Sequence, residues 1–206
     1  MTQVKRLTTI FALLLGLGVH TANAALIDQG DITYDDVNNT EWLDLSLTDG
    51  MSFDAAMAAY SADGWTIATE SEYQAMFDSH FIGFDDGGAS YLQVANGTAL
   101  ADQASVFTAL FGLVYENATL GASASYGLYL ENTPDGDLAR LGGMYHGSTV
   151  TNIHRDNNGD YSVYGADGFA NAGIFLVRAA SVPEASTLVM FAIGLLGLGF
   201  SRRKFK

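Results

Sequence analysis

The sequence contains no cysteine, and basic residues are scarce away from its two ends. The lack of cysteine excludes disulfide bonds and thiol chemistry. Between residues 25 and 180 only Arg140, Arg155 and Arg178 are basic, against twenty-two acidic residues, so this segment has a formal charge of −19. A surface of that charge repels nucleic acids and anionic lipid headgroups, and it attracts cations such as Ca²⁺.

Several signatures of enzymes are also missing. There is no Gly-x-Ser-x-Gly element and no glycine-rich phosphate loop after a strand. Internal repeats and low-complexity segments are absent as well. Carboxylate pairs are too common in so acidic a chain to indicate a glycosidase site. We therefore expect a protein that is not an enzyme, with a secreted hydrolase of dispersed site residues as the alternative.

The C-terminal tail combines an apolar run with a basic end. Residues 188–200 carry no charge, and counting from Ala185 gives sixteen residues, or about 24 Å of helix. This is short for a bilayer core of about 30 Å. The basic residues at 202–206 would stay on the cytoplasmic side and leave the preceding domain outside. The tail predicts a transmembrane helix at about 185–200, and the alternative is a helix buried in a globular core.

The N-terminus has the pattern of a signal peptide. Lys5 and Arg6 precede an apolar stretch at 7–19. Ala22 and Ala24 form a small-x-small cleavage site, which makes Ala25 the first mature residue. Residues 1–24 are therefore predicted to be removed by signal peptidase, and the alternative is a permanent anchor. Together the two ends predict one exported domain at 25–180.

The tail at 181–206 resembles the PEP-CTERM sorting signal of exported bacterial proteins. The resemblance rests on a short Pro-Glu element, the apolar helix and the basic end, although the second proline of the motif is Ala185 here. It implies an exosortase-like membrane protease as partner. It also implies a body outside the inner membrane before processing and at the cell surface or in a biofilm exopolysaccharide afterwards, with a retained inner-membrane protein as the alternative. The predicted sorting determinants are Val182, Pro183, Glu184, Arg202, Arg203 and Lys204.

Apolar periodicity and turn residues predict an α+β body with two early helices and a late antiparallel sheet. Ser52 is suited to cap a helix that ends before Gly64. Thr69 and Glu72 form a capping-box pattern at the start of a second helix. Alternating residues predict strands at 31–34, 40–45, 65–68, 126–130, 139–145, 161–164 and 173–178, and a third helix is predicted at 102–113.

Three stretches of the body resemble bacterial C-type-lectin-like domains, which share a Gly-Trp-Arg-Leu-Pro-Thr stretch with the sulfatase-modifying-factor group. These stretches are 34–43, 64–73 and the closing 173–178. Thr66 and Ala68 depart from the Arg and Pro of the family. The resemblance implies a single domain whose two ends share one sheet. It does not imply sulfatase modification, because the cysteines of that activity are absent.

One segment has the spacing of a degenerate calcium loop. Asp156, Asn158 and Asp160 place oxygen atoms at the first, third and fifth positions, but Tyr161 stands where glycine is wanted and Asp167 where glutamate is usual. The alternative is a hairpin turn rich in Asp and Asn. A metal site joining Asp156 to two histidines of the body, His146 and His154, would need the strands to bring all three together.

Aromatic residues gather in the same late region of the chain. Tyr145, Tyr161, Tyr164 and Phe169 lie beside Asp and Asn residues, which is typical of a sugar-binding surface. The alternative is packing within a tyrosine-rich sheet. For the two tryptophans, Trp42 and Trp65, we expect a role in the core.

Overall fold

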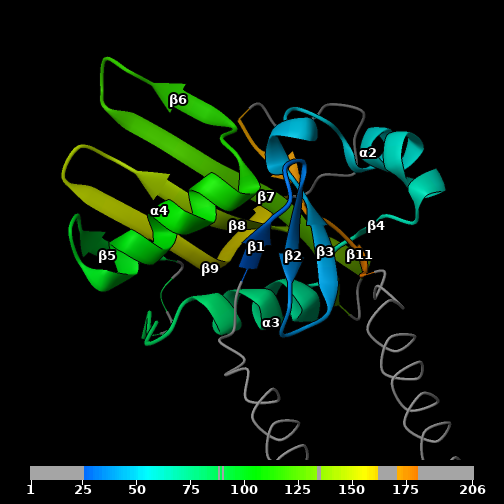
Figure 1. The fold of residues 1–206 in the computed structure, drawn as a ribbon, viewed down its shortest axis with the longest axis horizontal. Coiled ribbons are helices and arrows are strands. Elements are labelled where there is room, and N and C mark those ends of the chain that lie inside the picture. Colours follow the sequence, from blue (N-terminus) through cyan, green and yellow to red (C-terminus); the bar gives the residue numbers. More distant parts are fainter. Residues whose placement is uncertain (1–25, 88, 90, 134–135, 162–170, 181–206) are drawn as a thin grey trace, which may run out of the picture.

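The computed structural model describes residues 26–87, 89, 91–133, 136–161 and 171–180 (Figure 1). The side chains of 132–133, 136–137 and 156–161 are not described. Three helices and two sheets form one α+β body. The helices are α2 (Phe53–Tyr60), α3 (Glu70–His80) and α4 (Ala99–Phe111), with short 3-10 turns at Leu45–Leu47 and Ser61–Asp63.

The first sheet joins the two ends of the described chain. Its strands lie in the order β1-β2-β3-β11-β4. β11 is antiparallel to both β3 and β4, and Val177 is the partner of Trp42 in this register. Chain ends that share one sheet are what the lectin-like resemblance implies. The strands are β1 (Leu26–Asp28), β2 (Ile32–Asp35), β3 (Thr40–Leu43), β4 (Thr66–Ile67) and β11 (Leu176–Ala179).

The second sheet is larger and consists mainly of three long antiparallel strands. The order is β10-β7-β8-β9-β5, with β6 paired to β7 and with β10 parallel to β7. Figure 1 shows α4 lying across one face of this sheet. The strands are β5 (Leu92–Ala95), β6 (Tyr115–Asn117), β7 (Ala122–Thr133), β8 (Gly136–His146), β9 (Val150–Tyr161) and β10 (Gly173–Ile174).

The predicted caps of the first two long helices are confirmed. The Ser52 hydroxyl accepts a hydrogen bond from the Ala55 amide at 3.2 Å. Thr69 and Glu72 form a reciprocal capping box at the start of α3. α4 begins three residues earlier than predicted, because the Thr98 hydroxyl accepts a hydrogen bond from the Ala101 amide and so caps the helix.

The turn predicted at 156–160 is wrong. The backbone there belongs to β9, which continues to Tyr161 and pairs with β8. The register shifts twice between Ala139 and Gly143, so β9 carries extra residues as bulges relative to β8. A segment rich in Asp and Asn can itself form a strand when a neighbouring strand, here β8, satisfies its backbone hydrogen-bonding groups.

The core lies between the two sheets and the helices. Trp42 is 1% exposed and meets the rings of Phe111 and Phe175 edge-on. Trp65 is 3% exposed in a second cluster beside α2, so the predicted core role of both tryptophans is confirmed. At Gly142 the Tyr73 ring occupies the space of a side chain, and a Cβ there would overlap it.

The two predicted end signals lie outside the described residues, including the cleavage residues Ala22, Ala24 and Ala25 and the helix at about 185–200. Within the described part of the chain, no helix is both long and apolar enough to cross a membrane.

Candidate functional site

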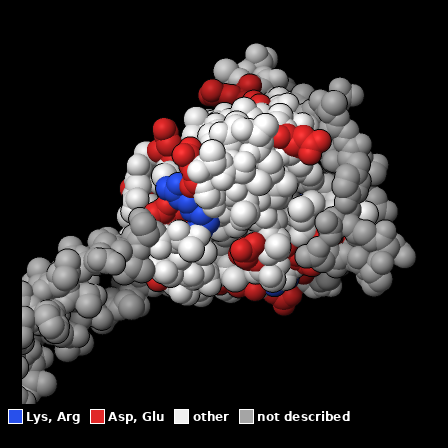
Figure 2. Space-filling view, turned by 90° about the vertical axis from the view of Figure 1, so that its right-hand side faces the viewer, with Lys and Arg blue, Asp and Glu red and all other residues white. Residues whose placement is uncertain are grey.

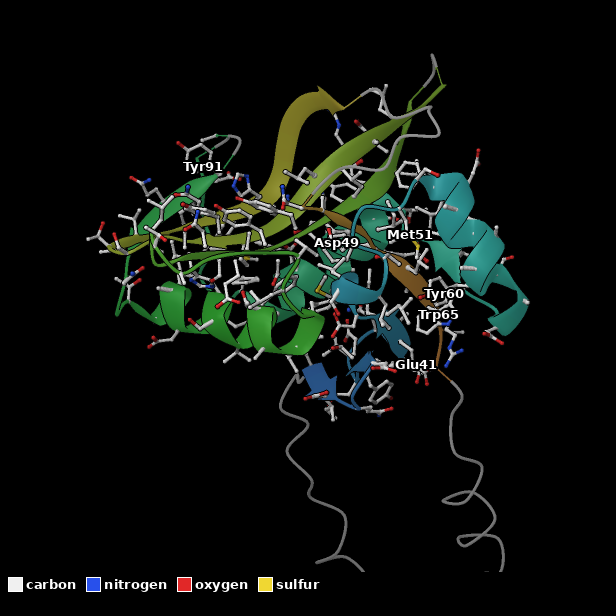
Figure 3. All side chains as sticks on the ribbon, turned by 90° about the horizontal axis from the view of Figure 1, so that it is seen from above. Glu41, Asp49, Met51, Tyr60, Trp65 and Tyr91 are labelled. Carbon is white, nitrogen blue, oxygen red and sulfur yellow. The ribbon has the colours of Figure 1, made fainter. Side chains whose placement is uncertain are left out.

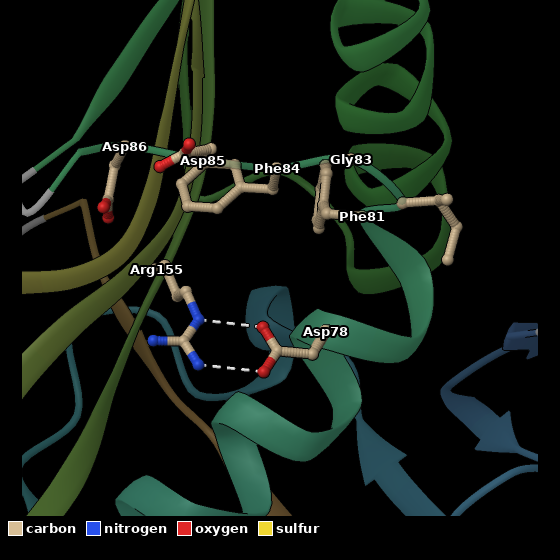
Figure 4. Close-up of a pocket in the computed structure, with 8 residues that line it drawn as sticks. Asp78, Phe81, Gly83, Phe84, Asp85, Asp86 and Arg155 are labelled. Carbon is tan, nitrogen blue, oxygen red and sulfur yellow. Dashed lines mark hydrogen bonds and ion pairs between the residues drawn. The ribbon is translucent and has the colours of Figure 1, made fainter.

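A pocket of about 460 Å³ opens where α3 ends beside β9 (Figure 4). The last turn of α3 closes with the Phe81 amide donating to the Phe77 carbonyl at 2.8 Å. The chain then turns through Gly83, whose φ is 83°. A further turn is held by the Asp85 carboxylate, which accepts a hydrogen bond from the Gly87 amide at 2.9 Å. The lining residues are Asp78, Phe81, Ile82, Gly83, Phe84, Asp85, Asp86 and Arg155.

An ion pair forms one side of this pocket. Arg155 donates through Nε and Nη2 to the two carboxylate oxygens of Asp78, both at 2.8 Å. The two side chains are 30% and 55% exposed, so water screens the pair and it contributes little to stability. Its consequence is geometric, because a two-point contact orients both charged groups at the opening.

The opposite side of the pocket combines apolar side chains, which the core supports, with the Asp85 carboxylate. Phe81 stacks on Phe77 at 4.4 Å between ring centroids, and Phe84 meets the same ring edge-on at 4.9 Å. Ile82 is 68% exposed at the rim. Figure 4 shows Phe84 and Asp85 on one side of the opening and the Arg155–Asp78 pair on the other. The pocket therefore offers an apolar wall and carboxylate oxygens to the same ligand.

His154 lies next to this site in the sequence and is buried beneath Tyr91. The two rings are 5.2 Å apart, and Tyr91 is 44% exposed on the side of the molecule away from α2 (Figure 3). Burial lowers the pKa of His154 to about 4. Its Nδ1 has no hydrogen-bond partner among the described residues, and its Nε2 is 3.4 Å from the Tyr126 hydroxyl. His154 is therefore neutral near pH 7.

A second pocket of about 380 Å³ lies between α4 and the adjoining ends of β8 and β9, and His146 is one of its lining residues. The Asn96 amide group donates to the Gly147 carbonyl, so its oxygen faces Thr151 and accepts from that hydroxyl at 2.9 Å. The Thr151 oxygen then accepts from His146 Nδ1 at 3.0 Å. With the ring proton on Nδ1, His146 Nε2 can accept from the Thr108 hydroxyl, which lies 3.1 Å away.

This arrangement places an imidazole base beside a hydroxyl group, as hydrolases do. However, Thr108 lies in the last turn of α4, where the helix dipole is negative. A negative helix end disfavours the alkoxide that a nucleophilic Thr108 would form. Burial also lowers the pKa of His146, so the ring is mostly neutral at pH 7. The geometry favours a pocket that binds hydroxyl groups over one that attacks a substrate.

The histidine–aspartate metal site is not assembled in the structure. His146 pairs with Thr151, so His154 lies three positions further along β9 and faces the other side of the sheet. No group of three or more His, Asp or Glu residues in the described part of the chain is arranged to hold a metal. The side chains of Asp156, Asn158 and Asp160 are not described, so calcium binding there stays a prediction.

The predicted aromatic cluster is only partly described. Tyr145 is half-buried on β8, while the side chain of Tyr161 and residues 162–170 lie outside what is described. Sequence reasoning missed the pocket at 81–86. The signal that could have found it is the apolar stretch Phe81–Phe84 directly before two acids.

The charge, the fold and the C-terminal sequence define a class of protein in which an acidic α+β body is followed directly by a C-terminal sorting tail. A family model described as the PEP-CTERM protein-sorting motif matches residues 181–204. The chain therefore carries a PEP-CTERM signal, as predicted, and is an exported protein that is routed through the membrane and processed by an exosortase-like protease. Comparisons with curated proteins and with solved structures found no match. The lectin-like assignment of the body stays a prediction.

Proposed function

We propose that the body is a non-enzymatic glycan-binding module, displayed at the cell surface or held in a biofilm exopolysaccharide after the tail is processed. The observation that supports this is the pocket beside α3. It sets Ile82 and Phe84, which the buried Phe81 supports from below, against carboxylate oxygens and the guanidinium of Arg155. Sugar rings present apolar C–H faces and several hydroxyl groups, and such a pocket complements both.

The charge of the site narrows the class of glycan. Asp78, Asp85 and Asp86 line the pocket against the single base Arg155, which is already paired with Asp78. Figure 2 shows acidic groups around one face of the body, with basic groups confined to a small patch. Such a field repels uronate polymers and attracts amines. We therefore propose that the ligand is a neutral or amino-bearing polysaccharide.

The test is calorimetric titration of the mature protein with neutral, amino-bearing and uronate oligosaccharides. We expect Ile82→Ser and Asp85→Asn each to weaken binding at least about fivefold, or about 1 kcal/mol. Leu120→Ser is the matched control, because Leu120 is 61% exposed and lies outside the pocket. Failure of every oligosaccharide to bind, or binding by both pocket variants as tight as that of the wild type, would rule out this site.

A secreted hydrolase is the second candidate function, and the contact between Thr108 and His146 is the observation that favours it. The glycan-binding proposal expects bound oligosaccharides to be recovered intact after long incubation. Chromatography that detects cleavage in the wild type but none in Thr108→Val would instead favour the hydrolase.

The proposed display at the surface has its own test in the mass of the mature protein. We expect protein from the medium or outer surface to have lost both ends and to span about Ala25 to the Pro183 region. Protein that keeps its tail and remains in the inner membrane would support the retained alternative.

A further inference from the structure

The end of the body from which the sorting tail leaves is held rigidly. β11 is paired on both sides, and the Ala180 amide donates to the Asn39 carbonyl at 3.0 Å. Arg178 reinforces this end, because its Nε donates to Glu41 at 2.7 Å and its Nη1 to the Asp63 carbonyl at 3.0 Å. Its guanidinium also lies 4.2 Å from the centre of the Trp65 ring. The chain is therefore fixed in position up to Ala180.

Very little chain separates this fixed end from the sorting element. Pro183 is the third residue after Ala180, and three residues span at most about 11 Å. A protease that acts at Pro183 or Glu184 must therefore approach to within about 11–14 Å of the last paired residue. β11 is not available as extra substrate, because it is paired with β3 from Val177 to Ala179 and with β4 at Leu176 and Val177.

The neighbouring turn between β2 and β3 lies at the same end of the molecule (Figure 1). The buried Asp35 carboxylate holds this turn by accepting from the amides of Val37 and Asn38, both at 3.0 Å, and from the Asn38 side chain at 2.7 Å. Val37 is 53% exposed on a turn that is thus already ordered. We call residues 36–39 and 178–180 the tail-proximal face.

From these observations we infer that the tail-proximal face docks on the outer surface of the processing protease, so that the body positions its own tail for cleavage. The short connection forces contact between the two proteins during processing. The bilayer surface is the less suitable partner, because anionic headgroups repel a body with a charge of −19. An exposed apolar residue on an ordered turn instead suits a protein surface. This inference rests on the sorting signal and does not depend on glycan binding.

The test measures the rate of tail removal in the native host by pulse-chase for four variants and for the combination of the first with the fourth. We expect Val37→Asp to slow processing at least fivefold and Val37→Ser to slow it less. Leu120→Asp is the control and should be processed at the wild-type rate, since it lies at the β6–β7 turn, far from the tail (Figure 1). In the fourth variant, ten Gly and Ser residues are inserted between Ala180 and Ser181. They should make the rate insensitive to Val37→Asp, because the tail then reaches the protease without docking.

Wild-type processing by Val37→Asp and Val37→Ser would overturn the inference. So would an equal loss of rate in Leu120→Asp, or a Val37→Asp defect that persists unchanged with the inserted linker, because either result would point to export or folding. The melting temperature of each variant is measured in parallel to confirm that the body is folded. Failure of the wild type to be processed at all would concern the sorting signal itself and is distinguishable from these outcomes.

Discussion

At the scale of single residues, Tyr73 connects the helical layer to the large sheet. Its hydroxyl accepts from the Gly143 amide at 2.9 Å and donates to the His154 carbonyl at 2.8 Å. Its ring stacks on Tyr129 at 4.5 Å. Gly142 leaves room for this ring at the centre of the sheet. One side chain therefore satisfies two buried backbone groups on neighbouring strands.

Tyr73→Phe keeps the ring and removes both hydrogen bonds. Because the Gly143 amide and the His154 carbonyl then lose their partner in the core, we expect the free energy of unfolding to fall by about 2 kcal/mol. Urea denaturation measures this. Tyr34→Phe is the control, because the Tyr34 hydroxyl bonds to Asn39 at an exposed site, and its effect should stay within about 0.5 kcal/mol. Equal effects of the two variants would contradict this account.

His154 should make stability depend on pH. Burial lowers its pKa to about 4, so the unfolded chain takes up the proton first as the pH falls below about 6.5. The free energy of unfolding should then decrease from pH 6.5 to pH 4 by up to about 1.4 kcal/mol per pH unit from this group. His154→Phe should lose that slope in urea titrations at a series of pH values. An unchanged slope, or an NMR titration of the His154 ring near pH 6.5, would contradict the prediction.

At the scale of secondary-structure elements, β11 is the strand on which the first sheet depends. It comes last in the described chain but lies between β3 and β4, which both come from the first part of the sequence. Leu176 is fully buried and Val177 is 1% exposed. These two side chains alone contribute about 3–6 kcal/mol, a large part of the stability of a small domain.

Truncations on either side of β11 test this dependence. A chain that ends at Ala180 should melt within about 2 °C of the protein that keeps its tail, because no described contact is lost. A chain that ends at Phe175 lacks β11, and we expect it to show no cooperative unfolding by circular dichroism. A cooperative transition in the shorter chain would show that the sheet forms without its last strand.

At the scale of the whole molecule, net charge opposes compaction. The body has twenty-two acidic and three basic residues, and all three bases are in ion pairs, namely Arg140 with Glu131, Arg155 with Asp78 and Arg178 with Glu41. Because like charges repel in the folded state, we expect the melting temperature to rise by several degrees between about 20 and 300 mM NaCl. Scanning calorimetry checks this, with KCl as an equivalent salt. A melting temperature that does not depend on salt would mean that the charges are too far apart to matter.

If Asp156, Asn158 and Asp160 bind Ca²⁺, calcium should stabilise the body more than its screening of charge alone would. At constant ionic strength we expect Ca²⁺ to raise the melting temperature more than Mg²⁺ does, since binding to the folded state stabilises it. Asp156→Ala should remove the difference. Glu116→Ala is the matched control, because it removes one exposed acid elsewhere and should keep the calcium effect. Equal responses to the two cations in the wild type would end the calcium hypothesis.

The features that sequence alone determined are local ones. The capping box at Thr69 and Glu72 depends on residues three apart, and the sorting tail depends on one continuous run of side chains. Both are therefore visible without knowledge of the fold. Sequence reasoning missed the short strands β1, β5 and β6 and read the segment at 156–160 as a turn, because strand formation depends on a distant partner.

Tertiary structure decided the rest. The ion pair of the candidate pocket joins Asp78 to Arg155, which are 77 positions apart, and only the approach of α3 to β9 brings them together. The same holds for Thr108 and His146, and for the place of β11 between two early strands. The net charge of the body can be counted from its composition. Where each charge lies relative to the apolar side chains of the pocket depends on contacts between distant segments, and such contacts leave no local pattern in the sequence.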